Sequence, residues 1–357
     1  MVIPPLRYKF CLISLIILSG CGSAPDISFN LDGNPNQFGG YFGPQVTVWD
    51  GAVVGNNFGR VVASVGDMDG DGNSDLLFGE PNANGGVGVA HVYSSFGGAL
   101  LWTGTGAGAG SNFGYSVSEI GDVNQDGRMD FAVGSTGGMG FVRVVSGTGA
   151  TLSTIVGSGN FFGSAIAAAG DLNGDQVPDF WVVVKSQAKV LGFSGANFQI
   201  IRTLNGPVSS DFGNSIVGGC RYDNDSVPDV VVGAPGTVVG GFDAGAVFVY
   251  SGANGSLLNQ YLAGGAGQPN YPFGIAGLKY GTSVACLDSD QDGFDDVLVG
   301  VPYGENSQAG FGNRGLGFLY LGGSSPPATP FYTFMGLKGG DNLGSSVASA
   351  GDVDGDG

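Results

Sequence analysis

Acidic side chains occupy alternate positions beside glycine at six places in this 357-residue chain. The first of these segments reads Asp67-Met-Asp69-Gly-Asp71-Gly-Asn73-Ser-Asp75. Carboxylate and amide oxygens at this spacing form a cage for a hard cation, and glycine at the sixth position permits the sharp turn that such a loop needs. The six segments therefore predict calcium-binding loops that recur along the chain.

The predicted ligands occupy positions one, three, five and nine of each loop, and position seven contributes its main-chain carbonyl. They are Asp67, Asp69, Asp71, Asn73 and Asp75; Asp122, Asn124, Asp126, Arg128 and Asp130; Asp171, Asn173, Asp175, Val177 and Asp179; Asp288, Asp290, Asp292, Phe294 and Asp296; and Asp352, Asp354 and Asp356. Oxygen-only donors argue against zinc and copper, and their number favours calcium over magnesium. Solvated turns remain the alternative for any single loop.

An EF-hand is excluded by the residues at loop position twelve. That position would hold a bidentate glutamate in an EF-hand, whereas here it holds apolar residues such as Phe78 and Val133. The pattern therefore predicts a calcium loop within a β-hairpin, closed by the aspartate at position nine.

The fourth loop departs from the pattern because Arg221 stands where the other loops begin with aspartate. Its guanidinium could lie among Asp223, Asp225 and Asp229 and take the place of the ion. We expect this loop to bind calcium weakly or not at all.

The loops recur with a period that indicates a repeated supersecondary unit, since their first positions are residues 67, 122, 171, 221, 288 and 352. An aromatic-glycine pair precedes most loops, and a short β-rich run such as Asp229-Val-Val-Val-Gly233 follows each complete one. Two further strand-like runs then complete each repeat. Four short strands per repeat predict one blade of a β-propeller, and therefore an all-β fold.

These motifs resemble the FG-GAP family, the repeats of the integrin α-subunit β-propeller. The marks of the resemblance are the pairs Phe58-Gly59, Phe113-Gly114, Phe162-Gly163 and Phe212-Gly213, the acidic loops, and Gly233-Ala-Pro235. The resemblance implies a seven-bladed propeller, here incomplete, with about five whole blades and partial ones over residues 41–357. Because the chain stops inside a loop, we expect the propeller to be truncated at its C-terminus.

The composition indicates an acidic globular protein that avoids nucleic acid. The formal net charge is −18, apolar residues make up 42% of the chain, and about two thirds of its 30 acidic residues lie in the six loops. No basic stripe is available to contact phosphate. The negative charge is thus concentrated at the predicted cation sites.

The N-terminus reads as an export signal, because Arg7 and Lys9 precede an apolar run, Phe10 to Leu18, that is too short to span a bilayer. Leu18-Ser19-Gly20-Cys21 resembles a bacterial lipobox, which implies that Cys21 is lipidated. We expect a signal peptide at 1–21, a linker at 22–40 and a lipid-anchored location in the cell envelope. A plain secretory signal cut near Ala24 is the alternative.

Two cysteines remain beyond the signal. Cys220 and Cys286 each precede an acidic loop in adjacent repeats, so a disulfide could form in an oxidising envelope. Buried free thiols are favoured, because a bridge requires the two Cα atoms to lie within roughly 7 Å of each other.

Enzyme signatures are scarce, which favours a non-catalytic binding or adhesion module for an extracellular protein or glycan. His91 is the only histidine, and a packed strand position is favoured for it over a general base. The resemblance places ligands on the face opposite the calcium loops, where the longest connections run from Gly264 to Lys279 and from Gly300 to Gly315. The candidate ligand-face residues there are Tyr271, Phe273, Lys279, Tyr303 and Arg314.

Two alternatives stay open. The repeats could belong to a secreted envelope enzyme of the lyase or phospholipase type whose catalytic domain lies outside this sequence. They could also form a structural array on the cell surface.

Overall fold

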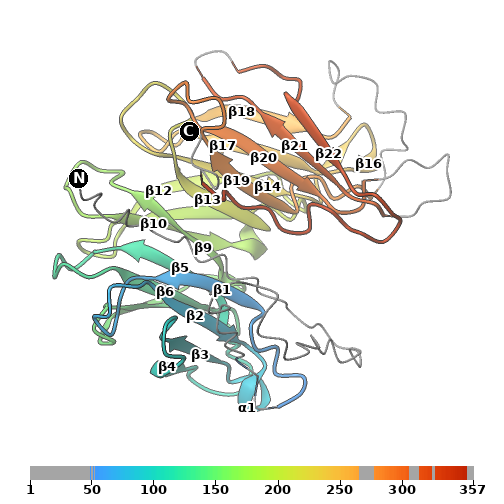
Figure 1. The fold of residues 1–357 in the computed structure, drawn as a ribbon. Helices are drawn as coiled ribbons and strands as arrows, with labels where there is room; N and C mark the ends of the chain where they lie inside the picture. Colours follow the sequence, from blue (N-terminus) through green and yellow to red (C-terminus); the bar gives the residue numbers. More distant parts are fainter. Residues whose placement is uncertain are drawn as a thin grey trace, which may run out of the picture. The chain divides into compact units, whose positions relative to one another are not determined.

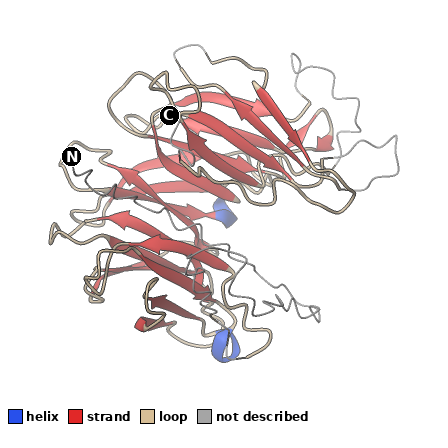
Figure 2. Cartoon of the chain, in the orientation of Figure 1, coloured by secondary structure: helices blue, strands red, loops and turns tan. Residues whose placement is uncertain are grey.

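The fold is all-β, and its repeated unit is a four-stranded antiparallel sheet in which the strands follow chain order. The computed structural model describes residues 49, 51, 53–264, 277–304, 313–323 and 326–351. All but the last two of these residues fall in one compact unit, Trp49–Ser349. Figure 1 shows the sheets along the chain, from blue β1 to orange-red β22, and Figure 2 shows how little helix is present.

The first three sheets are built alike. The first contains β1 (Val61–Val65), β2 (Asp75–Glu80), β3 (Val89–Tyr93) and β4 (Leu100–Thr105), with the single turn α1 (Ala83–Gly86) between β2 and β3. The second contains β5 (Phe113–Gly121), β6 (Asp130–Ser135), β7 (Phe141–Val145) and β8 (Thr151–Val156). The third contains β9 (Phe162–Gly170), β10 (Asp179–Val184), β11 (Lys189–Phe193) and β12 (Ile200–Asn205), with the 3-10 turn η1 (Lys185–Gln187) before β11.

Two more sheets complete the described part. The fourth contains β13 (Ser215–Cys220), β14 (Asp229–Ala234), β17 (Ala246–Tyr250) and β18 (Leu257–Leu262), and a short hairpin of β15 (Val238–Val239) and β16 (Phe242–Asp243) extends from it. The fifth contains β19 (Ser283–Leu287), β20 (Asp296–Val301), β21 (Leu316–Tyr320) and β22 (Tyr332–Met335). Five such sheets confirm the predicted all-β architecture of FG-GAP β-propeller blades.

The core lies between successive sheets and depends on the second strand of each. Strands β6, β10 and β14 are buried at all six positions, as expected of runs rich in β-branched residues. Alternate residues of one such strand contribute to different clusters: Val231 packs with the fifth sheet, whereas Val230 and Val232 pack with the third. Each blade therefore acquires its core from two neighbours.

The aromatic-glycine motif has a direct structural cause. The glycine of each described pair adopts a positive φ, for example 84° at Gly114 and 77° at Gly163, which other residues rarely adopt. Its carbonyl then meets the glycine four residues after the preceding loop closes, except between the third and fourth sheets, where Val183 stands at that position beside Gly213. A Cβ placed on Gly79 would lie 2.1 Å from the carbonyl oxygen of Gly114, and one on Gly134 would lie 2.2 Å from that of Gly163. The two glycines are thus an inter-blade contact without side chains.

Candidate cation-binding loops

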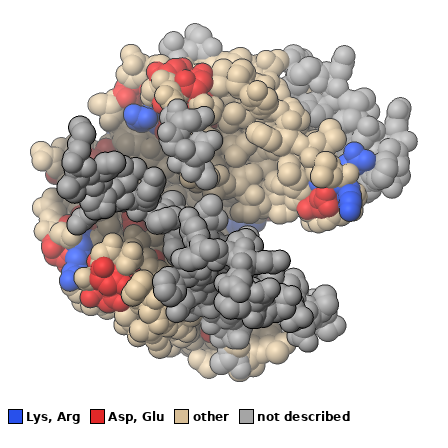
Figure 3. Space-filling view, in the orientation of Figure 1, with Lys and Arg blue, Asp and Glu red and all other residues tan. Residues whose placement is uncertain are grey.

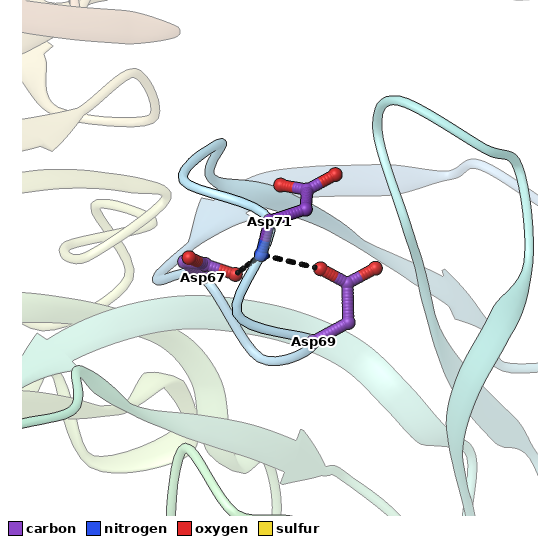
Figure 4. Close-up of side chains that lie close together, drawn as sticks. All are labelled: Asp67, Asp69 and Asp71. Atoms are coloured by element: carbon purple, nitrogen blue, oxygen red, sulfur yellow. Dashed lines mark hydrogen bonds between the residues drawn. The ribbon is translucent and has the colours of Figure 1, made fainter.

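Each of the five acidic loops in the described residues connects the first and second strands of its sheet, so the same hairpin end carries the loop in every described blade. In the first loop, Asp67 Oδ1 accepts hydrogen bonds from the backbone N–H groups of Gly70 (2.6 Å) and Asp71 (3.1 Å). Its Oδ2 accepts one from Gly72 at 2.7 Å. Figure 4 shows Asp67, Asp69 and Asp71 around this turn, with the Asp71 amide directed at the carboxylates of the other two. The first aspartate therefore shapes the turn that gathers the others.

The same bonds recur in the other loops that begin with aspartate. Asp122 accepts from Asp126 N and Gly127 N at 3.0 and 2.7 Å, and Asp288 accepts from Asp292 N and Gly293 N at 3.1 Å each. The spacing of four and five residues is the same as in the first loop. This local folding follows from the aspartate and the flexible positions after it.

Carboxylate oxygens converge in four of the described loops. In each group, one oxygen per residue lies within 4.8 Å of the others: Asp67, Asp69 and Asp71; Asp122, Asp126 and Asp130; Asp223, Asp225 and Asp229; Asp288, Asp290 and Asp292. In the described third loop, Asp171, Asp175 and Asp179 do not reach this mutual distance. Asn173 there donates to Asp175 Oδ2 at 3.0 Å. Oxygen-only groups of this kind suit calcium better than a softer metal.

The seventh-position residues, predicted as carbonyl ligands, are anchored by their amides. The N–H groups of Asn73, Arg128, Val177 and Phe294 each donate to the fifth-position aspartate of their own loop at 2.8 to 2.9 Å. Arg128 also turns its guanidinium away, donating from Nη1 to the Met68 carbonyl at 3.0 Å. This side chain therefore connects the second loop with the first.

The ninth-position aspartates have a role that the sequence pattern did not reveal. Asp179 is fully buried; its Oδ2 accepts the Leu172 N–H at 2.8 Å and its Oδ1 accepts the Gly195 N–H at 2.9 Å. Leu172 lies in the same loop, whereas Gly195 lies in the turn between the third and fourth strands. Equivalent pairs of bonds are made by Asp75, Asp130, Asp229 and Asp296. Each of these aspartates therefore links its loop by hydrogen bonds to the turn between the third and fourth strands of the same blade.

The pKa values of the ninth-position and first-position aspartates shift in opposite directions in the first and third loops. Desolvation raises the pKa of Asp75, Asp130 and Asp179, and it raises the pKa of Asp229 to about 6. By contrast, the N–H of Gly72 lowers the pKa of the half-buried Asp67 carboxyl. The first loop therefore combines an outer carboxylate, Asp67, that is stabilised in the charged form with an inner carboxylate, Asp75, whose burial opposes ionisation.

The predicted placement of Arg221 is wrong. Its Nη2 lies 3.9 Å from Asp288 Oδ2 and 3.9 Å from Asp295 Oδ1, both in the fifth sheet's loop rather than its own. Asp295 holds the backbone there, because it accepts the Arg221 N–H at 2.7 Å and donates its own N–H to the Arg221 carbonyl at 2.8 Å. The carboxylates of Asp223, Asp225 and Asp229 gather without the guanidinium.

The preference for free thiols is also wrong. Cys220 and Cys286 form a disulfide with their Cα atoms 6.0 Å apart. Cys220 is the last residue of β13, and Cys286 is the last but one of β19. These two strands are the first strands of adjacent sheets and lie in contact. The sequence could not show this contact, since it depends on how two repeats pack rather than on either repeat alone.

The remaining predicted residues are dispersed. Lys279 Nζ lies 2.8 Å from Asp243 Oδ2, Tyr303 is exposed, and Arg314 Nη1 lies 4.0 Å from the sulfur of Met335. His91 is packed, with Nδ1 3.0 Å from Thr103 Oγ1 and Nε2 3.5 Å from Glu80 Oε2.

Several predictions fall on residues outside the described part of the chain. These are the signal peptide with Cys21, the linker, Tyr271, Phe273, Asp352, Asp354 and Asp356.

Comparison with known proteins agrees with the repeat architecture. Residues 122–182, which hold the second and third loops, match the family model for an FG-GAP-like repeat. The chain is 32% identical to integrin alpha-5 of Xenopus laevis over 150 residues, 42% of this chain and 13% of that protein. It is 30% identical to integrin alpha-2 of Mus musculus over 171 residues, 45% of this chain and 13% of that protein.

A longer match is to integrin alpha-V of Gallus gallus, 29% identical over 247 residues, 67% of this chain and 19% of that protein. The chain thus spans less than a fifth of the length of these relatives. Together with the five sheets, these similarities support an FG-GAP, integrin-α-like domain. Within the described residues, no helix is both long and apolar enough to cross a membrane.

Proposed function

We propose that this chain is a calcium-stabilised, non-catalytic binding module that acts outside the cell on an extracellular protein ligand or glycan. The observation that carries the proposal is the recurrence of convergent carboxylates at the same hairpin end of four of the five described blades. One such cluster would be an ordinary acidic turn, but four in equivalent positions indicate a shared ligand. The similarity to integrin alpha subunits supports the binding role.

The calcium ions would have a structural role, in which they stabilise the loops. The residues that would hold them are the aspartates of each loop, the buried ninth-position one included, with Asn124 and Asn173 adding amide oxygens. Without a cation, three or more carboxylates within one small loop repel one another, and the net charge of −18 adds to this repulsion. A bound divalent ion reverses that repulsion and rigidifies the end of the hairpin.

An export signal and a lipid anchor at Cys21 complete the proposal, with residues 41–357 forming the propeller region. The extracellular setting is consistent with the Cys220–Cys286 disulfide, because such bonds persist in oxidising compartments. Mass spectrometry of the protein purified from envelope membranes would test the anchor: a diacylglyceryl group on Cys21 supports it, and an unmodified chain beginning near Ala24 contradicts it.

Chelation tests the role of calcium. A ligand at about 100 times its dissociation constant adds roughly 2.7 kcal/mol per site, so removal from several sites should lower the melting temperature by about 10 °C or more. The measurement is thermal unfolding in EGTA, in calcium and in magnesium. Calcium should restore the transition more fully than magnesium, and an unchanged melting temperature in EGTA would contradict the proposal.

A further inference from the structure

A hollow of about 330 Å³ lies where the first and second sheets meet, at the hairpin ends opposite the acidic loops. Ala107 and Ser111, between β4 and β5, form one side. Gly137, Met139 and Gly140, between β6 and β7, form another. The volume is at the lower end of the range that holds small molecules. The Gly137 N–H donates to the Ser111 carbonyl at 2.9 Å, so the two connections are fixed to each other.

Arg143 provides the only charge among the described residues that line this hollow. It lies in the middle of β7, directly opposite Thr154 of β8, and its guanidinium carbon is 4.7 Å from the ring of Phe113 and 5.7 Å from the ring of Phe141. Nη1 donates to the Thr105 carbonyl at 2.9 Å. The two rings and this single bond hold the guanidinium in place.

This guanidinium has no counter-ion in the part of the chain that the structure describes. In a chain with 30 acidic residues, no carboxylate among the described residues lies within 4 Å of Arg143. None of its other nitrogen atoms is both buried and unpaired in the described structure, so they remain open to solvent. Desolvation lowers the pKa of Arg143, as expected of a half-buried cation without a partner. A bound carboxylate would supply the missing counter-ion and accept charge-assisted hydrogen bonds from the solvent-facing nitrogen atoms.

The other residues that line the hollow determine which kind of anion would fit there. Met139, Phe141 and Val156 contribute apolar wall, and Met139 and Val156 are 57% and 70% exposed. The Ser111 and Thr154 hydroxyls are the neighbouring polar groups. A fully hydrated anion such as phosphate would leave the apolar wall without a partner, whereas a carboxylate on a short apolar chain would cover both.

We propose that this hollow binds a small organic carboxylate, with Arg143 pairing the carboxylate and Met139, Phe141 and Val156 covering its apolar body. The inference deepens the proposed binding function, on which it rests, by naming a ligand class and a site. The carboxylate could belong to the C-terminal residue of a peptide or to an alkanoate.

The experiment uses the whole chain in calcium-containing buffer, with hexanoate, N-acetylleucine, hexylamine and inorganic phosphate as probes in ligand-observed NMR titrations. Hexanoate or N-acetylleucine should bind saturably, and the tighter of the two identifies the source of the carboxylate. Hexylamine should not bind, because it places a cation against Arg143. Phosphate binding as tightly as the carboxylates would overturn the proposal, as would the absence of saturable carboxylate binding.

Two variants locate the site. Arg143→Met keeps the apolar contact with Phe113 and should weaken carboxylate binding at least ten-fold. Arg60→Met is the matched control, because the Arg60 guanidinium also stacks on an aromatic ring, that of Tyr115 at 3.8 Å, yet lies outside the hollow. Equal affinity in Arg143→Met and wild type would overturn the assignment. Melting temperatures with and without calcium, measured on the same samples, report the proposed calcium role separately.

Discussion

The loop pattern contains two kinds of aspartate, which differ in burial and in structural role. The outer ones are half-buried at position one, where they shape the turn, and exposed at position five, whereas the ninth-position aspartate is buried and bonds to two backbone N–H groups. Both kinds look alike in the sequence. Their separate roles lead to different expectations when each is removed.

Asp179→Ala should destabilise the protein even in the absence of calcium. The substitution leaves the buried N–H groups of Leu172 and Gly195 without an acceptor, at a cost of about 2–4 kcal/mol in the free energy of unfolding. Urea unfolding in EGTA measures this. Asp175→Ala, which removes an exposed carboxylate of the same loop, is the control and should change stability little in EGTA. Equal losses for the two variants would refute the distinction.

Arg221→Asp should add a calcium site. The substitution supplies the missing first ligand beside the convergent Asp223, Asp225 and Asp229, and it also removes a positive charge from the vicinity of Asp288. Calorimetric titration should give one more bound ion per chain than the wild type. Arg221→Gln is the control, because it removes the charge without supplying a carboxylate. The same added stoichiometry in both variants would show that charge, rather than the ligand, limits this loop.

At the scale of strands and sheets, neighbouring blades are connected by contacts that differ from one junction to the next. Arg128 reaches from the second loop to the backbone of the first, and Arg202 Nε donates to the Gly252 carbonyl at 3.1 Å. The junction of the fourth and fifth sheets has the disulfide and the reciprocal bonds of Arg221 and Asp295. This junction is therefore the most heavily cross-linked of those described.

Removing the disulfide should destabilise the protein measurably. The bridge closes a loop with a sequence separation of 66 residues, for which about 2–4 kcal/mol of the free energy of unfolding is typical. Denaturant unfolding of the Cys220→Ala, Cys286→Ala double variant measures the loss. A thiol reductant should lower the stability of the wild type toward that of the variant and leave the variant unchanged. A wild type that responds no more than the variant would contradict the expectation.

Across the whole molecule, acidic residues greatly outnumber basic ones. The chain has 12 basic and 30 acidic residues, and in Figure 3 acidic atoms gather in a few separate patches on an otherwise largely uncharged surface. Charges so placed repel most within each patch. Ions that bind or screen those patches should therefore govern stability.

Salt should partly replace calcium. In 1 M NaCl the screening length falls to about 3 Å, so the calcium-free protein should melt at a higher temperature than in 10 mM salt. The calcium-loaded protein should gain less, because its clustered carboxylates are already neutralised. Melting curves at both salt concentrations, with and without EGTA, measure the difference. An equal gain in both states would show that repulsion within the loops is not what calcium relieves.

The sequence by itself determined the repeat, the four strands in each unit and the acidic residues that gather in the loops. These features depend on local spacing, namely alternate acids, turn-forming glycines and β-branched runs, which act over a few residues. Only the tertiary structure decided what depends on two repeats meeting, as with the disulfide and the placement of Arg221. The same holds for the Arg143 guanidinium, which lacks a carboxylate partner among the described residues and whose hollow is lined by the second sheet and the connection that leads to it from the first. Local patterns specify one blade. Contacts between blades join residues far apart in the chain, so no fixed spacing in the sequence predicts them.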